Sequence, residues 1–568
     1  MLICGLKITH DGGVAIIDNG RLVGSFEVEK FDNRHRYAEL DDLALVERVL
    51  GSQDIELGDV DLFAVDGWGY GEPDPVVGTS HRGVAVRLAV APYRESQVSD
   101  DSLAAYRFDG LPLGRKEFPY DSFHHTTGHI LSAYCASPFA AAGEPSYVVV
   151  WDGGVLPRGY YVRPDGRHIE NLGPIFGLIG NVYPWFAMHF PPFRPQDLGG
   201  PPDRVRYHQL SVPGKVMAYT ALGEVRDDLC RVFDDIYADE LVISMDFAGA
   251  LAKSFLARTA GSALRPADAL ASFQHWLGVQ LVRSISEMRE LSPGYAGNLC
   301  FSGGCALNIK WNAEIRASGV FDRFFVPPFP NDSGAALGAA CAAMVSRTGN
   351  IALDWSVYSG PVLGVADGAV DGYRPRPCSV TQLARLLHES GEAVVVLHGR
   401  AELGPRALGN RSILMSATDG ANKDRLNTMK RRESYRPVSP ICLTSRAPAI
   451  FEPGVPDPYM LFEHRVRPEW TSRIPAVIHL DGTARLQTVD HRYNPVIGEL
   501  LTEYERCSGI PVLCNTSANL NGCGFFPDVE SALRWGGAPY VWSDGRLWER
   551  LPGGREAGQP REGIDGDS

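Results

Sequence analysis

Apolar and polar positions alternate along the first thirty residues, on both sides of Asn19-Gly20. The segments VAIID and RLVGSFEV therefore predict a β-hairpin with a type I′ turn, because Asn-Gly tolerates the positive φ that both turn positions need. DLFAVDGW, SYVVVWDGG and NLCFSGG are further strand patterns, and each ends in Asp or Gly. Apolar residues at helical spacing predict helices at 41–50, 123–134, 267–291, 305–315 and in the small-residue segment after Asp332.

Strands that alternate with helices, with Gly, Asp and Asn at the strand ends, indicate an α/β fold with ligands at the carboxyl edges of its strands. Two blocks of similar layout suggest a duplicated core. A Gly- and Pro-rich stretch at 362–378 predicts a domain boundary, followed by helix VTQLARLLHES and strand EAVVVLHG. The expected domains are 1–365 and 366–552, with a disordered tail at 553–568, and the segment 190–203 is predicted to be an exposed loop.

Composition narrows the class of protein. A chain of 568 residues is too long for one core. Its eleven cysteines are scattered without a C-x-x-C pair, which fits reduced thiols in a cytoplasmic enzyme. No apolar run reaches the roughly 18 residues that span a bilayer, so no membrane partner is expected. The formal net charge of −14 disfavours a nucleic-acid partner.

The segment FHHTTGH carries the first candidate chemistry. His125 and His129 are four residues apart, so on a helix both imidazoles reach one metal ion. Packing alone is the other interpretation of this pair. Asp152 and Asp332 stand at strand-end turns and add carboxylates, although each can instead cap the next helix. Two histidines with carboxylates suit a divalent ion of the iron type with open positions for substrate oxygens.

Two further segments suit anions. Gly303 and Gly304 let the backbone approach a ligand, and their N–H groups at a helix N-terminus suit a phosphate; a tight turn is the alternative. Arginine and lysine gather between residues 400 and 436, against the sign of the whole chain, and Asn515–Asn519 supplies amides and hydroxyls for the same ligand. A surface salt-bridge network is the alternative interpretation of the cations Arg406, Arg411, Lys430, Arg432 and Arg436.

These pieces resemble the antibiotic and nodulation-factor O-carbamoyltransferases of the NodU/CmcH/TobZ type. The matching stretches follow the family order over nearly the whole chain: HHTTGH, PGKVMAYTALG, FSGGCALN, PNDSGAALGAA, GRAELGPRALGNRSIL, MKRRESYRPVSP and PVLCNTSAN. The resemblance implies a duplicated actin/Hsp70-like (ASKHA) N-terminal domain similar to the tRNA threonylcarbamoyl transferase TsaD. It also implies a YrdC-like α/β C-terminal domain.

The implied reaction is ATP-dependent carbamoyl transfer from carbamoyl phosphate, through carbamoyladenylate, to a hydroxyl of a small-molecule acceptor. The implied cofactors are ATP with Mg²⁺ and a divalent metal, with iron expected. By the family motifs, the metal ligands are His125, His129, Asp152 and Asp332, and His10 takes the proton of the acceptor. Lys215, Gly303, Gly304 and Asn308 line the nucleotide part of the intermediate, whereas Arg406, Lys430, Arg436, Arg485, Asn515 and Ser517 hold carbamoyl phosphate and ATP.

Departures from the family pattern lie after Asp152, after Met217 and at Ala518, and they leave the identity of the acceptor open. The oligomeric state is also not readable from the sequence. Two other functions remain as alternatives. A tRNA threonylcarbamoyl transferase-like enzyme is disfavoured by the acidic charge, and a non-catalytic ATP-binding regulator leaves the His pair and the arginine-rich segment without a role.

Overall fold

The computed structural model describes most of the chain as two compact units. Unit 1 comprises Met1–Gly360, Leu403–Pro405 and Leu461–Glu463; unit 2 comprises Pro361–Glu402, Arg406–Met460 and the chain from His464 onward. The predicted division after residue 365 and the predicted tail at 553–568 lie outside the described residues. The described residues are 1–69, 74–95, 101–166, 168–195, 202–241, 245–364, 370 and 372–552.

The first sheet of unit 1 begins with the predicted hairpin. Asn19 and Gly20 have φ values of 48° and 83°, as a type I′ turn requires. β1 pairs antiparallel with β2 and parallel with β4, and β4 pairs parallel with β8. The sheet order is β3-β2-β1-β4-β8-β7. The strands are β1 (Leu2–Lys7), β2 (Gly13–Asp18), β3 (Arg21–Glu27), β4 (Leu62–Asp66), β7 (Tyr106–Leu113) and β8 (Lys116–Phe123).

The second sheet of unit 1 repeats this pattern. Its order is β11-β10-β9-β12-β13, with two antiparallel pairs followed by two parallel pairs. Thus β9 corresponds to β1 and β12 to β4, and the predicted duplication is visible in the strand order. The strands are β9 (Ser146–Val150), β10 (Arg158–Val162), β11 (Ile169–Pro174), β12 (Asn298–Ser302) and β13 (Arg323–Phe325).

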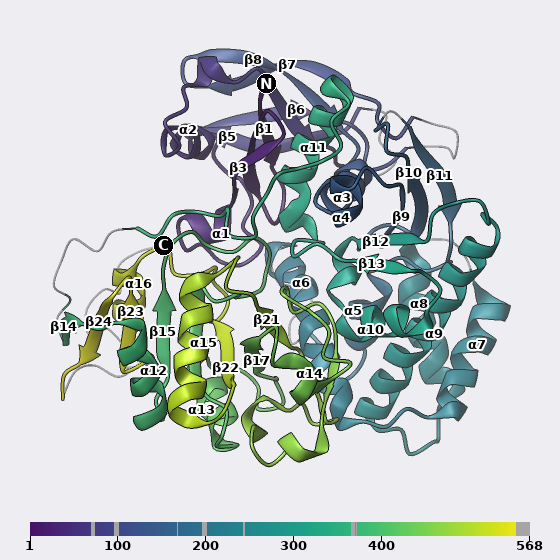
Figure 1. Ribbon diagram of the computed structural model, residues 1–568. Coiled ribbons are helices and arrows are strands. Elements are labelled where there is room, and N and C mark those ends of the chain that lie inside the picture. The colour runs from purple at the N-terminus through teal and green to yellow at the C-terminus, as the bar shows by residue number, and fades with distance from the viewer. Residues whose placement is uncertain are drawn as a thin grey trace. The chain divides into compact units, whose positions relative to one another are not determined.

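Helices α3 (His125–Cys135) and α11 (Ala335–Thr348) pack closely against each other within unit 1. A Cβ on Gly338 would lie 2.3 Å from the carbonyl oxygen of Gly128, so only glycine permits this approach. Other helices gather beside the second sheet (Figure 1). They are α5 (Val182–Ala187), α7 (Asp227–Glu240), α8 (Met245–Arg258), α9 (Pro266–Glu290) and α10 (Ile309–Ser318).

Unit 2 is built on a mixed sheet of order β14-β24-β23-β15-β16-β22-β17-β21. Helix α12 (Val380–Glu389) begins with a capping box of Ser379 and Gln382, and α15 (Pro495–Ser508) packs against it. The strands are β14 (Tyr373–Pro377), β15 (Val394–Leu397), β16 (Arg411–Ser416), β17 (Ser439–Leu443), β21 (Gln487–Val489), β22 (Val512–Ser517), β23 (Tyr540–Ser543) and β24 (Arg546–Arg550).

Two local predictions are confirmed only in part. The expected helix at 305–315 is a 3₁₀ turn, Gly304–Leu307, followed by α10, because the Asn308 side chain accepts hydrogen bonds from the N–H groups of Lys310 and Trp311 and caps a new helix. In the segment predicted as an exposed loop, Pro191, Pro192 and Arg194 are exposed as expected, whereas Phe190 and Phe193 are buried. Residues 196–201 of that segment lie outside the described chain.

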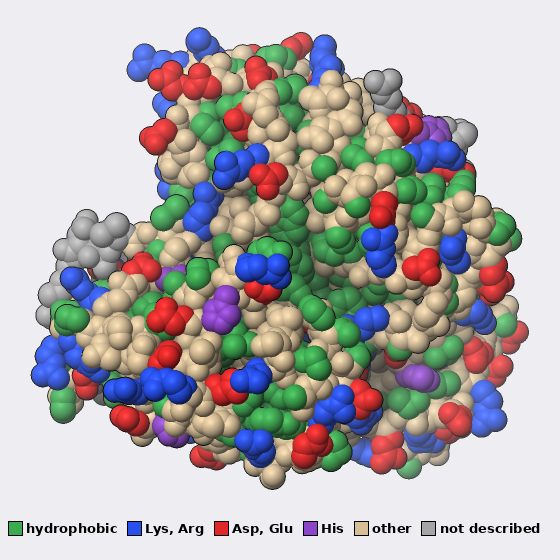
Figure 2. All heavy atoms as spheres, viewed as in Figure 1, with side chains coloured by type: hydrophobic (Ala, Val, Ile, Leu, Met, Phe, Trp, Pro, Cys, Tyr) green, Lys and Arg blue, Asp and Glu red, His purple; other side chains and the backbone are tan. Residues whose placement is uncertain are grey.

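On the face shown in Figure 2, basic and acidic side chains are interspersed, and neither sign forms a broad patch among the residues described there. Among the described residues, no helix combines the length and the apolar character needed to cross a membrane.

Candidate functional site

The four predicted metal ligands come together in unit 1. His125 and His129 lie on α3, Asp152 follows β9, and Asp332 opens the turn before α11. One ligand atom from each lies within 4.8 Å of all the others, and all four residues are buried. Helix α3 and two strand ends thus bring distant segments of the chain to one point.

The donor set fits a metal ion. His125 Nδ1 lies 2.7 Å from Asp66 Oδ2, so the Nδ1 proton is shared with this carboxylate and Nε2 is left as a lone-pair donor. The Nε2 atoms of His125 and His129 are 3.1 Å apart. Two nitrogen ligands at about 2.1 Å from one ion are separated by about this distance when the angle at the ion is near a right angle.

Asp332 joins the two imidazoles. Its Oδ1 lies 3.4 Å from His125 Nε2 and 3.5 Å from His129 Nε2. Burial opposes ionisation of Asp332, but the charges of Lys7 and His125 outweigh burial and hold its pKa well below the usual range. Burial likewise disfavours a charged His125, yet the carboxylates of Asp66 and Asp332 raise its pKa to about 9. The site therefore attracts positive charge.

Asp152 is held in place from two sides. Tyr93 donates its hydroxyl proton to Oδ2 at 2.6 Å, and the N–H of Gly304 donates to Oδ1 at 2.7 Å. The N–H of Gly303 donates to the carbonyl oxygen of Pro330 at 2.8 Å. These two N–H groups are used within the protein, which corrects the expectation that they face a phosphate. Gly303 is needed for its φ of 90° and because a Cβ there would lie 2.4 Å from Trp151 O.

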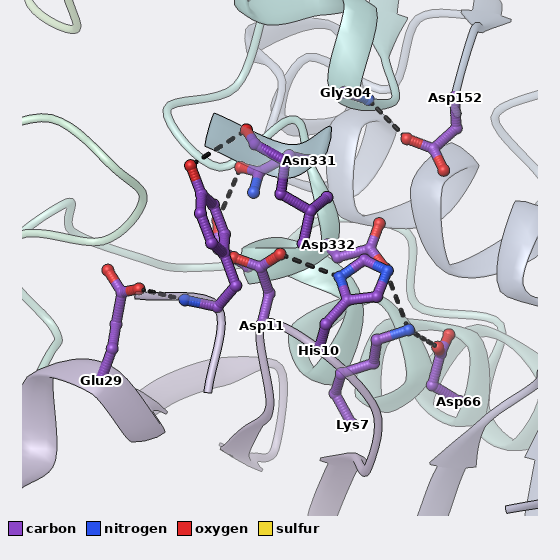
Figure 3. A network of polar contacts seen from close by, with 12 residues as sticks. Lys7, His10, Asp11, Glu29, Asp66, Asp152, Gly304, Asn331 and Asp332 are labelled. Atoms are coloured by element: carbon purple, nitrogen blue, oxygen red, sulfur yellow. Dashed lines mark hydrogen bonds and ion pairs between the residues drawn. The ribbon is translucent and has the colours of Figure 1, made fainter. Parts of the chain in front are cut away.

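His10 lies beside the His–Asp cluster, where Figure 3 shows its ring between Asp11 and Asp332. Nδ1 is 3.1 Å from Asp11 Oδ2, and Nε2 is 3.6 Å from Asp332 Oδ2. The ring follows β1, and its edge meets Trp68 with 5.3 Å between centroids. The strand end thus directs one nitrogen of His10 toward the cluster.

The remaining two residues predicted for unit 1 differ in their surroundings. Lys215 is half-buried on α6 (Pro202–Tyr219). Asn308 is buried, and its amide exchanges hydrogen bonds with Gln274 at 3.0 and 3.2 Å while also capping α10. Asn308 therefore has a structural task that the sequence motif did not reveal, and a role in lining a nucleotide stays a prediction for both residues.

In unit 2, a buried carboxylate shapes the loop that carries Arg406. Glu402 is fully buried, and its Oε1 accepts hydrogen bonds from the N–H groups of Leu408, Asn410 and Arg411 at 2.6, 2.8 and 3.0 Å. Three bonds to one oxygen close the loop on itself. Arg406 is half-buried within it.

Arg411 belongs to the frame of this loop rather than to a ligand site. Its guanidinium is buried and donates to the carbonyl oxygens of His398, Asn410 and Gly399 at 2.6, 3.0 and 3.0 Å. Burial lowers its pKa to about 10. Of the five cations between residues 400 and 436 that the sequence singled out, this one has its donors occupied by the backbone.

Lys430 and Ser517, predicted for one site, are in contact. Lys430 Nζ donates to Ser517 Oγ at 2.8 Å and also contacts the carbonyl of Ser517 and the side chain of Asn519. The Asn515 amide donates to Gln487 Oε1 at 2.7 Å and to Ala407 O at 3.1 Å. The carboxyl end of β22 is thereby tied to the loop after Arg406. Among the described residues, Asn515 Oδ1 is buried without a hydrogen-bond partner.

Three arginines of unit 2 destabilise one another's charged forms. Burial, then the charges of Arg436 and Arg432, lower the pKa of Arg485 to about 10. Burial and Arg436 lower the pKa of Arg432 to about 9. Nearby carboxylates compensate only in part: Glu433 lies 3.7 Å from Arg436, and Asp457 favours the charged form of Arg485. This arginine cluster (Arg432, Arg436 and Arg485) therefore attracts an anion.

Several residues that complete the two sites were not predicted. Lys7 is a charged residue inside the otherwise apolar strand LICGLK, and Asp66 ends the strand of DLFAVDGW. Both features are visible in the sequence, as a lone charge in a buried strand and as an acid at a strand end. No feature of the sequence marks Glu402 or Gln487 in this way. Glu402 binds backbone N–H groups, and Gln487 binds the amide of Asn515, which is distant in sequence.

The solved structures that are similar to this chain match it with low TM-scores and low sequence identity. An activator of 2-hydroxyisocaproyl-CoA dehydratase from Clostridium difficile with bound ADPNP has a TM-score of 0.32 at 14% identity, covering 61% of this chain and 95% of that one. Full-length HypF in a phosphate- and nucleotide-bound form has a TM-score of 0.30 at 10% identity, covering 61% of this chain and 47% of that one.

Comparison with sequences is far more specific. A family model described as carbamoyltransferase N-terminus matches residues 2–341, and one described as carbamoyltransferase C-terminus matches residues 384–537. Nodulation protein U of Bradyrhizobium diazoefficiens is 45% identical over 97% of each chain. The 3'-hydroxymethylcephem-O-carbamoyltransferase of Streptomyces clavuligerus is 35% identical over 94% of this chain and 96% of its own. The chain therefore belongs to the carbamoyltransferase family and is a carbamoyltransferase.

Proposed function

We propose that this carbamoyltransferase makes carbamoyladenylate from carbamoyl phosphate and ATP in unit 2 and transfers the carbamoyl group in unit 1 to a hydroxyl of a small natural-product acceptor. The observation that carries the proposal is the buried cluster of two imidazoles and two carboxylates with His10 beside it. Relatives that bear the names of a nodulation protein and a cephem O-carbamoyltransferase support a hydroxyl acceptor.

The first half-reaction needs a site for phosphate groups. Carbamoyl phosphate and ATP are polyanions, and Arg406, Lys430 and the arginine cluster supply guanidinium and ammonium donors for them. Asn515 and Ser517 offer amide and hydroxyl groups to uncharged parts of the same ligands. Water cleaves carbamoyl phosphate to carbamate and phosphate, a carbamate oxygen then attacks the α-phosphorus of ATP, and pyrophosphate leaves. Mg²⁺ is expected to accompany ATP. We assign this half-reaction to a YrdC-like domain.

In the second half-reaction, the acceptor oxygen attacks the carbamoyl carbon, the bond from that carbon to the phosphate oxygen breaks, and AMP leaves. His10 Nε2 takes the proton of the acceptor hydroxyl. Asp11 holds Nδ1 at 3.1 Å and thereby fixes which ring nitrogen is the acceptor. We assign this step to a duplicated actin/Hsp70-like domain in which Lys215 and Asn308 lie along the nucleotide. Gly303 and Gly304 leave room beside it, and their N–H groups bind within the protein.

His125, His129, Asp152 and Asp332 would hold the metal ion, for which iron in the divalent state is our expectation. When bound, such an ion supplies Lewis acidity toward the carbamoyl carbonyl. Asp66 holds His125 Nδ1 and thereby turns Nε2 toward the ion, and Tyr93 and Gly304 orient Asp152.

The test is mass spectrometry of reactions that contain carbamoyl phosphate, ATP and a panel of hydroxylated acceptors. We expect an acceptor to gain one carbamoyl group only when both carbamoyl phosphate and ATP are present. Transfer that proceeds without ATP, or pyrophosphate release that does not depend on carbamoyl phosphate, would contradict the proposal. The His10→Ala variant serves as the matched control for carbamoylation that does not use this site.

A further inference from the structure

Lys7 is a buried cation next to the His–Asp cluster. Its side chain is 1% exposed, and Nζ lies 2.9 Å from Asp66 Oδ2 and 3.1 Å from Asp332 Oδ2. Nζ also lies 4.0 Å from the centroid of the Trp68 ring. Figure 3 shows the ammonium between the two carboxylates. A buried ammonium is costly unless carboxylates pair with it, so this arrangement keeps Lys7 charged.

Asp66 closes a ring of contacts around the cluster. Its Oδ2 is shared by Lys7 and by His125 Nδ1 at 2.7 Å. Asp332 completes the ring, because its Oδ2 faces Lys7 while its Oδ1 faces His125 Nε2. Both carboxylates thus meet Lys7 and His125, and Asp332 also faces His129. Lys7 and Asp66 are linked to the ligands but are not themselves ligands.

The charges of this ring and of the metal ligands do not cancel. Asp66, Asp152 and Asp332 bring three negative charges, and Lys7 brings one positive charge, which leaves a balance of minus two. The two imidazoles contribute no charge when they serve as ligands. One divalent ion makes this buried group neutral, whereas a trivalent ion leaves one excess positive charge.

We propose that Lys7 and Asp66 set the charge of the metal site so that it holds a divalent ion in preference to a trivalent one. The inference rests on the metal site of the proposed function. Its physical basis is that any fixed charge near the ion acts on a trivalent ion half as strongly again as on a divalent ion. Changing one fixed charge therefore changes the affinity for a trivalent ion more than the affinity for a divalent ion. The ratio of the two affinities changes as a result.

Two substitutions should move this ratio in opposite directions. Lys7→Met removes the positive charge and keeps the length of the side chain, so relative affinity for the trivalent ion should rise by on the order of 10- to 100-fold. Asp66→Asn removes a negative charge and keeps an oxygen for His125, so the ratio should fall by a similar factor. The double variant should return near the ratio of the unmodified protein.

Lys30→Met is the matched control. Lys30 is also a buried lysine of unit 1, and it pairs with Glu27 at 2.8 Å. Lys30 also contacts the carbonyl oxygen of Gly404. The same chemical change at this position should leave the ratio of the two affinities where it was.

The measurement is competitive binding of Zn²⁺ and Ga³⁺ in chelator buffers, followed by elemental analysis, with circular dichroism to confirm that each variant is folded. Opposite shifts that cancel in the double variant support the inference. Equal losses of both ions in Lys7→Met and Asp66→Asn mean that these residues only support the structure, and they overturn it. If the unmodified protein binds neither ion, the metal assignment itself fails. Should Lys7→Met not fold, Asp66→Asn alone decides, because an unchanged ratio there contradicts the charge balance.

Discussion

The His–Asp cluster of unit 1 is buried and the arginine cluster of unit 2 is half-buried, and the two are unbalanced in opposite directions. In unit 1, carboxylates outnumber cations, and the pKa of His125 is raised to about 9 in spite of burial. In unit 2, guanidinium groups outnumber carboxylates, and burial with mutual repulsion lowers the pKa of Arg485 to about 10. A buried excess of one sign indicates a ligand of the other, so the first site suits a cation and the second an anion.

The two sites also differ in what holds them. The ligands of unit 1 stand on a helix and at strand ends, so the sheet and α3 fix their spacing. In unit 2, Arg406 and Lys430 stand on loops that are fastened by Glu402 and by the end of β22. Changes to single ligands should therefore act locally in unit 1, whereas changes to the fastening residues should act on a whole loop in unit 2.

The largest effect is expected when both imidazoles of the metal site are removed. The variant His125→Ala/His129→Ala should lose its metal and show no detectable transfer, because two of the four ligands are gone. Elemental analysis and product formation measure this. His124→Ala is the control: this neighbouring buried histidine bonds to the Pro92 carbonyl at 2.9 Å and should keep the metal. Full metal content in the double variant would refute the assignment.

His10→Ala tests whether the cation site also has its own base. We expect turnover to fall by roughly 10²–10⁴-fold while metal content stays unchanged, because His10 accepts a proton and is not a ligand. Steady-state kinetics and elemental analysis on the same preparation separate the two effects. Turnover near that of the unmodified enzyme would leave His10 with a structural role beside Asp11.

The anion site can be probed without catalysis. Saturating inorganic phosphate should raise the Tm of the unmodified protein by roughly 5 °C, because phosphate relieves repulsion among the arginines. Arg485→Met removes one of the repelling guanidinium groups, so the rise in Tm that phosphate causes should fall to less than half of that in the unmodified protein. Arg473→Met, which removes a guanidinium stacked on Trp470 at 3.9 Å, should keep the full shift. Equal shifts in all three proteins would contradict the anion site.

A smaller effect is expected at Glu314, which lies near a second acid, Glu463, and near one lysine, Lys310. Burial, then the charge of Glu463, raises the pKa of Glu314 to about 7 from an ordinary value of 4.5, and Lys310 offsets this only in part. As pH rises from 4.5 to 7, the unfolded chain releases this proton before the folded chain does, so the folded state loses stability over that range.

Glu314→Gln should therefore be close to neutral at pH 4.5 and stabilising at pH 8, by roughly 1–2 kcal/mol after allowance for partial exposure. Urea unfolding at both pH values measures the difference. Glu503→Gln removes a half-buried acid that pairs with Arg506 at 2.7 Å and whose pKa is lowered, so it should not stabilise the protein at pH 8. A Glu314→Gln variant with the same effect at both pH values would contradict the assignment.

Much of the fold could be predicted from local pattern. The hairpin at Asn19-Gly20, the helices at α3 and α9 and the strand ends at Asp152 and Gly303 all follow from residues close in sequence. The break at Asn308 could not be predicted with certainty, because a capping side chain competes with helix continuation only in its tertiary setting. The burial of Phe190 depends on packing against α8, which no local pattern contains.

The candidate metal ligands could be predicted as residue types, and the structure brings all four together. The charge balance around them could not, because Lys7 and Asp66 are 59 positions apart and meet only when β1 and β4 pair. In unit 2, Arg406 and Lys430 were predicted from a cationic segment, but the sequence did not distinguish Arg411, whose donors serve the backbone.

Synthetic carbamoyladenylate tests whether the two half-reactions occur at two sites, a cation site in unit 1 and an anion site in unit 2. Lys430→Ala should fail to release pyrophosphate from carbamoyl phosphate and ATP, because it lacks a cation of the anion site, whereas His10→Ala should still release it. Supplied carbamoyladenylate should restore product in Lys430→Ala but not in His10→Ala. If Lys430→Ala releases pyrophosphate at the unmodified rate, or if the intermediate rescues both variants equally, the two sites do not divide the reaction in this way.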